Sequence, residues 1–163
     1  MYWHVLWTVY PIPVPNRQRN SIERLYELYE ALKIDKIEHE VSQALKVTAQ
    51  SSNIQPGRLI INPRSIEEDI SSLTNYNSDR IAGNLPIIGI SVTTDRVELL
   101  AEFDGDNLLQ KIARLKSRSA TLLSFRSERG GKHTWSKGIW YARSTDKRFM
   151  QYVRERIIKL KNS

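Results

Sequence analysis

Residues 87–103 read IIGISVTTDRVELLAEF, two apolar runs separated by a polar tetrapeptide. The runs Ile87–Val92 and Val97–Phe103 are rich in residues that favour strands, and Thr93–Arg96 separates them as a short turn. The sequence therefore predicts a β-hairpin here, followed by a helix over Gly105–Ser117.

A second hairpin is predicted around the adjacent glycines Gly130 and Gly131, which suit a two-residue turn. Its strands would cover Ala120–Glu128 and His133–Arg143. A helix over Asp146–Leu160 follows, with an apolar stripe that should lie across a sheet. Residues 84–163 are thus expected to form a β-β-α-β-β-α half.

Residues 1–76 are expected to form a β-α-α-β-α half. The predicted elements are a strand over Tyr2–Tyr10, a helix that opens at the capping box Asn20–Glu23, a helix over Lys36–Ala49, a strand over Arg58–Asn62 and a helix over Ser65–Leu73. The polar stretch Thr74–Asn84 is the predicted seam. The fold class is α+β with a mainly antiparallel sheet, arranged as one compact domain over 1–163 or as two subdomains that share a core.

Charge is unevenly distributed along the chain, although the formal net charge is only +7. Residues 1–110 hold ten Lys or Arg against fifteen Asp or Glu, a net of −5. Residues 111–163 hold fifteen Lys or Arg against three acidic residues, a net of +12. The last third should therefore present a positive surface, which favours a polyanionic partner.

The predicted second hairpin brings cations and aromatic rings to one face. Pairing across the glycine turn places Arg126 opposite Trp135, and period-two alternation leaves Leu123 and Phe125 for the core. Cations that hold phosphates beside rings that stack on bases are typical of nucleic-acid binding. Including the basic stripe of the preceding helix, the candidate binding residues are Lys111, Arg114, Arg118, Arg126, Arg129, Lys132, His133, Trp135, Lys137, Tyr141 and Arg143.

Four carboxylates offer an enzymatic alternative. Asp104 and Asp106 follow a predicted strand, and Glu98 and Glu102 share the strand face of Asp104. Oxygen ligands of this kind could hold Mg²⁺, which would make the protein a divalent-metal nuclease. The other interpretation is that Asp106 or Asn107 caps the following helix.

The leading hypothesis is a non-enzymatic nucleic-acid-binding protein without a cofactor, with the type of nucleic acid left open. A third hypothesis is an interaction subunit, whose acidic first half meets a protein partner or another copy of the chain. The absence of cysteine excludes a disulfide scaffold and a thiolate zinc site. We expect a cytoplasmic protein with no membrane contact, because no run approaches membrane-spanning length.

Overall fold

The computed structural model describes residues 1–8, 30, 33–34, 37–41, 63–75, 85–93, 96–105, 107–126, 135 and 138–162. The helices and strands in them are β1 (Tyr2–Thr8), β2 (Glu38–Val41), α3 (Pro63–Asn75), β3 (Ile87–Val92), β4 (Arg96–Glu102), α4 (Leu108–Arg126), β5 (Trp140–Ser144) and α5 (Lys147–Lys161).

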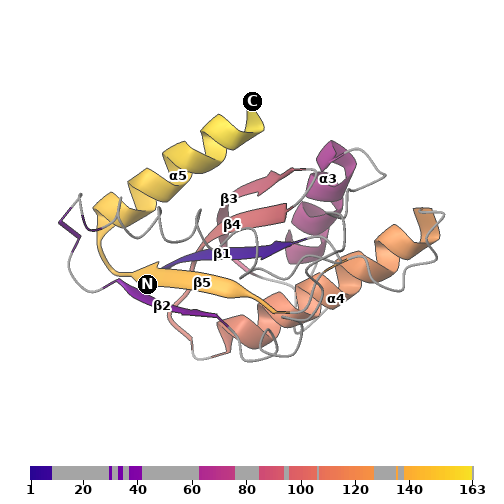
Figure 1. Ribbon diagram of the computed structural model, residues 1–163. Coiled ribbons are helices and arrows are strands. Elements are labelled where there is room, and N and C mark those ends of the chain that lie inside the picture. The colour runs from indigo at the N-terminus through magenta and orange to yellow at the C-terminus, as the bar shows by residue number, and fades with distance from the viewer. Residues whose placement is uncertain are drawn as a thin grey trace, which may run out of the picture.

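The five strands form one sheet in the order β2-β5-β1-β4-β3, and every neighbouring pair is antiparallel (Figure 1). With β2 and the C-terminal helix α5 set aside, the described elements follow the order β-α-β-β-α-β. This chain order, combined with the spatial order β5-β1-β4-β3, is that of the ferredoxin-like, or split β-α-β, arrangement. The predicted α+β class is confirmed.

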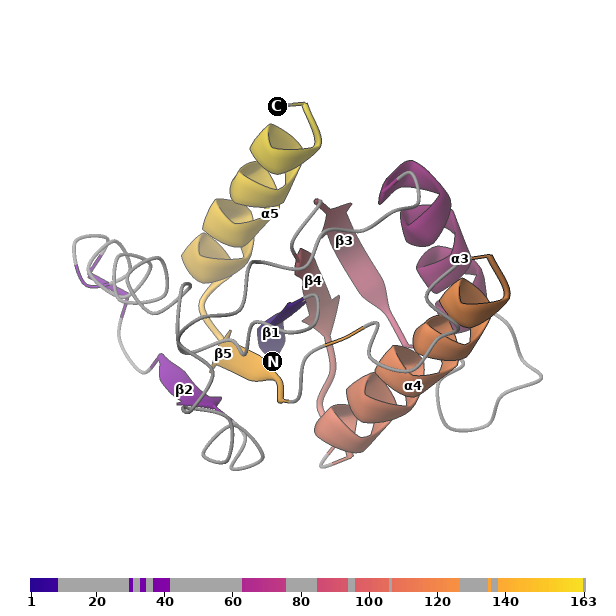
Figure 2. The same ribbon diagram turned by 45° about the vertical axis from the view of Figure 1, so that its right-hand side comes forward.

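Helices cover both faces of the sheet. Figures 1 and 2 show α3 and α4 on one face and α5 on the other. Side chains of β1 alternate between the two layers, as a strand requires. Trp3, Val5 and Trp7 join the core beneath α3 and α4, whereas Leu6 joins the core beneath α5. The central strand is therefore buried on both sides, which explains its nearly continuous apolar sequence.

The predicted C-terminal helix is confirmed as α5. Asp146 is its N-cap and accepts a 2.8 Å hydrogen bond from the backbone N–H of Arg148. Phe149, Val153 and Ile157 form its buried stripe at spacings of four residues. Local periodicity was sufficient to predict this element.

The first predicted hairpin is also confirmed. β3 and β4 pair with Ile90 opposite Leu99, and the Thr93 N–H donates a 2.9 Å hydrogen bond to the Arg96 carbonyl across the turn. Further elements agree with the sequence: β1 lies within the predicted first strand, and α3 includes the predicted helix Ser65–Leu73.

The predicted strand over Ala120–Glu128 is wrong, because α4 continues through this segment to Arg126. No glycine or proline interrupts residues 108–126, so each added residue extends the helix by a further hydrogen bond. The glycine turn at 130–131, on which the second hairpin was based, lies outside the described residues.

The predicted helix over Lys36–Ala49 is wrong at Glu38–Val41, because these residues form strand β2. β2 pairs antiparallel with β5, with Glu38 opposite Arg143 and Val41 opposite Trp140. Helix propensity is a weak preference that tertiary pairing overrides, and an open sheet edge supplied that pairing here. The predicted capping box Asn20–Glu23 and the strand Arg58–Asn62 lie outside the described residues.

In the part of the chain that the structure describes, no helix is long and apolar enough to cross a membrane.

Candidate functional site

The outward face of α4 carries positive charge between Lys111 and Arg118. At 19 residues the helix is about 28 Å long, and it contains no Asp or Glu. Its inward side carries Leu108, Ile112 and Leu115, all fully or almost fully buried. The exposed or partly exposed residues of the opposite side, called the α4 face below, are Gln110, Lys111, Ala113, Arg114, Ser117, Arg118 and Thr121. Three of the predicted binding residues therefore share one accessible surface.

Two more predicted residues lie in a group of rings and cations at the N-terminal end of α4. The Arg143 guanidinium carbon is 4.9 Å from the centre of the Trp3 ring. The centre of the Tyr141 ring is 5.2 Å from the centre of the same Trp3 ring. Trp3 donates a 3.0 Å hydrogen bond from Nε1 to the Phe103 carbonyl, and Lys111 Nζ lies 6.0 Å from the Phe103 ring centre. These five residues, called the basic–aromatic cluster, connect β1, β5 and the end of β4 to α4.

Sequence reasoning found Lys111, Tyr141 and Arg143 but missed Trp3 and Phe103. The alternating pattern of the first strand did mark Trp3 as a face residue. It could not show that β1 lies between β5 and β4, which is what places Trp3 beside Arg143 and the Phe103 backbone. Cation–π contacts of this kind orient the charged side chains.

Trp135 is part of the core, so its prediction as an exposed stacking ring is wrong. Its side chain is only 8% exposed, and Nε1 donates a 2.9 Å hydrogen bond to Ser119 Oγ of α4. The ring meets Trp7 edge to face, with 6.0 Å between centres. The predicted pairing with Arg126 does not exist, because Arg126 ends a helix instead of belonging to a strand.

A neighbouring contact also joins α4 to the chain leading into β5. Lys116 Nζ donates a 2.9 Å hydrogen bond to the Gly138 carbonyl, and Gly138 has the positive φ of 93° that glycine tolerates. Burial lowers the pKa of Lys116 to about 8. This lysine therefore acts as a structural tie on the flank of α4.

The remaining predicted binding residues are not placed. Arg129, Lys132, His133 and Lys137 lie outside the described residues, and only the backbone of Arg126 is described.

A buried charged network lies on the other face of the sheet, beneath α5. Glu98 is 1% exposed, and its Oε2 lies 3.1 Å from Nε2 of the fully buried His4. Arg156 of α5 binds the carboxylate with two hydrogen bonds, from Nε at 3.1 Å and from Nη2 at 3.0 Å, and Arg96 Nε lies 3.2 Å from Oε1. The network fastens α5 to β1 and β4 by charge as well as by apolar contact.

The environment of Glu98 favours its charged form. Burial by itself would raise the pKa of this carboxyl, but the hydrogen bonds and positive charges of His4 and Arg156 outweigh burial and hold the pKa far below its ordinary value. Glu98 is consequently a carboxylate with its oxygens already engaged.

The four predicted metal ligands do not form a described site. Glu98 belongs to the network under α5, and Asp104 accepts a 2.7 Å hydrogen bond from the N-terminal ammonium of Met1. Glu102 is exposed at the end of β4, about 14 Å along the strand from Glu98. Asp106 lies outside the described residues. In the described ranges, no three His, Asp or Glu side chains are grouped as metal ligation requires.

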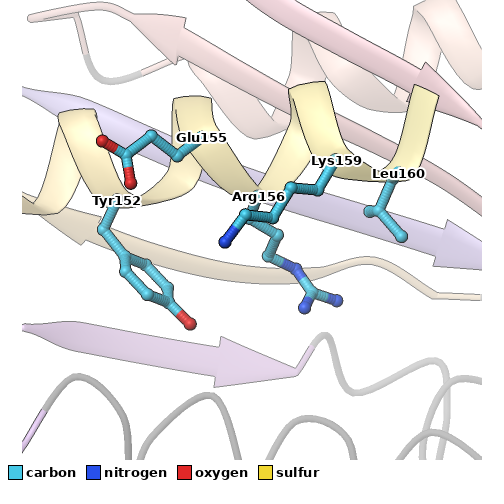
Figure 3. Close-up of a pocket in the computed structure, with 5 residues that line it drawn as sticks. All are labelled: Tyr152, Glu155, Arg156, Lys159 and Leu160. Atoms are coloured by element: carbon cyan, nitrogen blue, oxygen red, sulfur yellow. The ribbon is translucent and has the colours of Figure 1, made fainter. Parts of the chain in front are cut away.

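A pocket of about 330 Å³ lies against α5, lined by Tyr152, Glu155, Arg156, Lys159 and Leu160 (Figure 3). Figure 3 shows the ends of Tyr152, Arg156 and Lys159 on the same side of the helix. Burial raises the pKa of Tyr152, the Arg156 charge opposes this rise and the Glu98 charge adds to it. The Arg156 guanidinium is directed largely to Glu98, so this pocket adjoins the network.

Neither a scan against protein-family models nor a search of curated proteins finds a match for this chain.

Proposed function

We propose that this protein binds nucleic acid through the α4 face and the adjoining basic–aromatic cluster. The observation that carries the proposal is a 19-residue helix without a single carboxylate, exposed on one side and packed into the core on the other. A rigid positive surface of this kind attracts phosphates and loses little conformational entropy when it binds them.

The cations would contact phosphates from two places. Arg114 and Arg118 are exposed on α4 and would contact phosphates directly, since phosphate contacts provide most of the non-specific affinity for nucleic acid. Lys111 and Arg143 would do so from the basic–aromatic cluster, where the rings of Phe103 and Trp3 orient them. Arg126, the last residue of α4, remains part of the proposal as a prediction. So do Arg129, Lys132, His133 and Lys137, which follow α4 closely in the sequence.

The other two hypotheses receive less support. Lys161 pairs with Glu67 of α3 at 2.6 Å, and Arg156 pairs with Glu98. Such pairs balance part of the basic C-terminal region against earlier acidic residues within one chain, which weakens the argument for pairing between chains. The nuclease alternative stays a prediction, since no contact among the described carboxylates favours it.

A cytoplasmic location is proposed on the basis of the proposed ligand.

Replacing Lys111, Arg114 and Arg118 together with alanine should weaken nucleic-acid binding by about 10- to 100-fold at moderate salt. Fluorescence anisotropy with labelled DNA and RNA, repeated from 50 to 300 mM KCl, measures the effect. Neutralising about five phosphates gives the parent protein a log–log salt slope of about −3.5 to −4.5, and losing three contacts reduces its magnitude by about 2 to 3.

The matched control replaces Lys147, Arg154 and Lys159 with alanine. These three cations are exposed on α5, across the sheet from α4, and their loss changes the net charge equally. The control should alter affinity by no more than a few-fold. Equal weakening by both triple variants, or a flat salt response of the parent protein, would contradict the proposal.

A further inference from the structure

We infer that the nucleic acid recognised by the α4 face is a B-form DNA duplex, with α4 lying in its major groove. This inference rests on the proposed function and adds the class of ligand to it.

The tryptophans of the protein offer little surface for stacking unpaired bases. Single-strand binding relies on accessible rings, but all four tryptophans of the protein are buried: Trp3, Trp7, Trp135 and Trp140. The sheet face opposite α3 and α4 is not an open platform either, because the buried stripe of α5 packs on it (Figure 2). A ligand that presents paired, stacked bases fits this surface better than a single strand.

The α4 face matches the major groove in size and chemistry. The groove is about 12 Å wide and admits an α-helix, whose diameter with side chains is about 10–12 Å. Arg114 and Arg118 are one turn apart, and arginine pairs with the guanine edge or with phosphate. Gln110 can pair with adenine, and the short side chains of Ser117 and Thr121 leave room for the helix to approach.

The elements packed against α4 hold it in place. Its inward side is fastened by the Ser119–Trp135 hydrogen bond, and its flank by the hydrogen bond from Lys116 to Gly138. The neighbouring helix α3 carries acidic residues, but Glu67 pairs with Lys161 and Glu68 lies 3.8 Å from Arg64. Repulsion of phosphates by α3 is thereby reduced.

Duplex RNA should bind less well than duplex DNA. The major groove of A-form RNA is deep and narrow, so a helix and its side chains cannot enter it. Fluorescence anisotropy in 150 mM KCl would compare a 20-base-pair DNA duplex of mixed sequence with the corresponding RNA duplex and with the separate strands. The affinity for the DNA duplex should be at least about 10-fold higher than the affinity for each of the others. Methylation of guanine N7, which lies in the major groove, should weaken duplex binding.

A bulky substitution provides a test that leaves charge unchanged. Ser117→Tyr places a ring at the centre of the α4 face and should weaken DNA-duplex binding by about 10-fold, with little effect on residual single-strand binding. Gln151→Tyr, at an exposed position of α5, is the matched control and should have no effect. Thermal unfolding of both variants should match that of the parent protein.

The outcomes separate the inference from the function on which it rests. Salt-dependent binding that is as tight for single strands or duplex RNA as for duplex DNA overturns the inference and leaves nucleic-acid binding intact. Unchanged duplex affinity of Ser117→Tyr also overturns it. No binding to any of these nucleic acids overturns both.

Discussion

Replacing Glu98 with glutamine is expected to lower the free energy of unfolding by about 3–5 kcal/mol, because it leaves buried cations without their counter-charge. Arg96 and Arg156 both lie against this carboxylate, and their side chains are only 15% and 22% exposed. For a domain of this size the loss corresponds to a fall in melting temperature of about 6–20 °C. Circular dichroism during heating and urea titration would measure it.

Glu155→Gln is the matched control for this experiment. Glu155 is the sequence neighbour of Arg156 but is exposed on α5, so its loss should change the free energy of unfolding by less than about 0.5 kcal/mol. If Glu98→Gln and Glu155→Gln melt alike, the network does not stabilise the attachment of α5.

The dependence of stability on acid pH should provide a second test of the Glu98 network. The pKa of Glu98 is lower in the folded state than in the unfolded chain, so below its ordinary value of 4.5 the unfolded state binds more protons. The contribution of ionised Glu98 to the free energy of unfolding is therefore fully present above pH 4.5 and is lost progressively as the pH falls below this value. Urea midpoints measured from pH 6 to pH 2.5 should fall less steeply in Glu98→Gln than in the parent protein.

Replacing Trp135 with alanine is expected to cost about 3–5 kcal/mol of folding free energy, owing to the cavity that the large side chain leaves against Trp7. Trp135→Phe keeps a ring but loses the donor to Ser119, so its cost should be about 1–2 kcal/mol. Urea unfolding of both variants tests whether Trp135→Ala is the more destabilising change. Thr121→Ala, at an exposed position of α4, is the control and should leave the free energy of unfolding nearly unchanged.

Binding measurements on Trp135→Phe separate a structural residue from a binding residue. A buried Trp135 predicts unchanged nucleic-acid affinity of the folded protein. If Trp135 instead stacked on a base, removing its indole would weaken binding, since one stacked base contributes about 1–3 kcal/mol. A clear loss of affinity in a fully folded Trp135→Phe variant would contradict its assignment to the core.

The elements predicted correctly are those with strong local signals. Asp146 and the apolar stripe of α5 lie within a few residues of one another, and the β3–β4 hairpin spans a single turn. The errors occurred where a local pattern suited two structures. The sequence of Thr121–Arg126 is compatible with the period of a strand and with the period of a helix. Its continuation as helix depended on the core contacts that α4 makes further upstream.

The candidate site shows the same division. The cations of α4 could be predicted because a helix places residues three and four apart on one side. Trp3 and Phe103 could not, because they are separated by 100 residues and are joined by a hydrogen bond that only the strand order creates. Glu98 was noticed as a carboxylate, but its partners come from β1, from the start of its own strand and from α5.

The amino-acid sequence by itself determined the α+β class, the elements with strong local patterns and the excess of positive charge in the last third. Tertiary structure alone decided that β1 lies between β5 and β4, that every tryptophan is buried and that Trp3 and Phe103 lie beside the cations of β5 and α4. The physical reason is range: hydrogen bonding and periodicity within a helix or hairpin depend on neighbouring residues, whereas burial and ion pairing depend on segments that meet only after the sheet has formed.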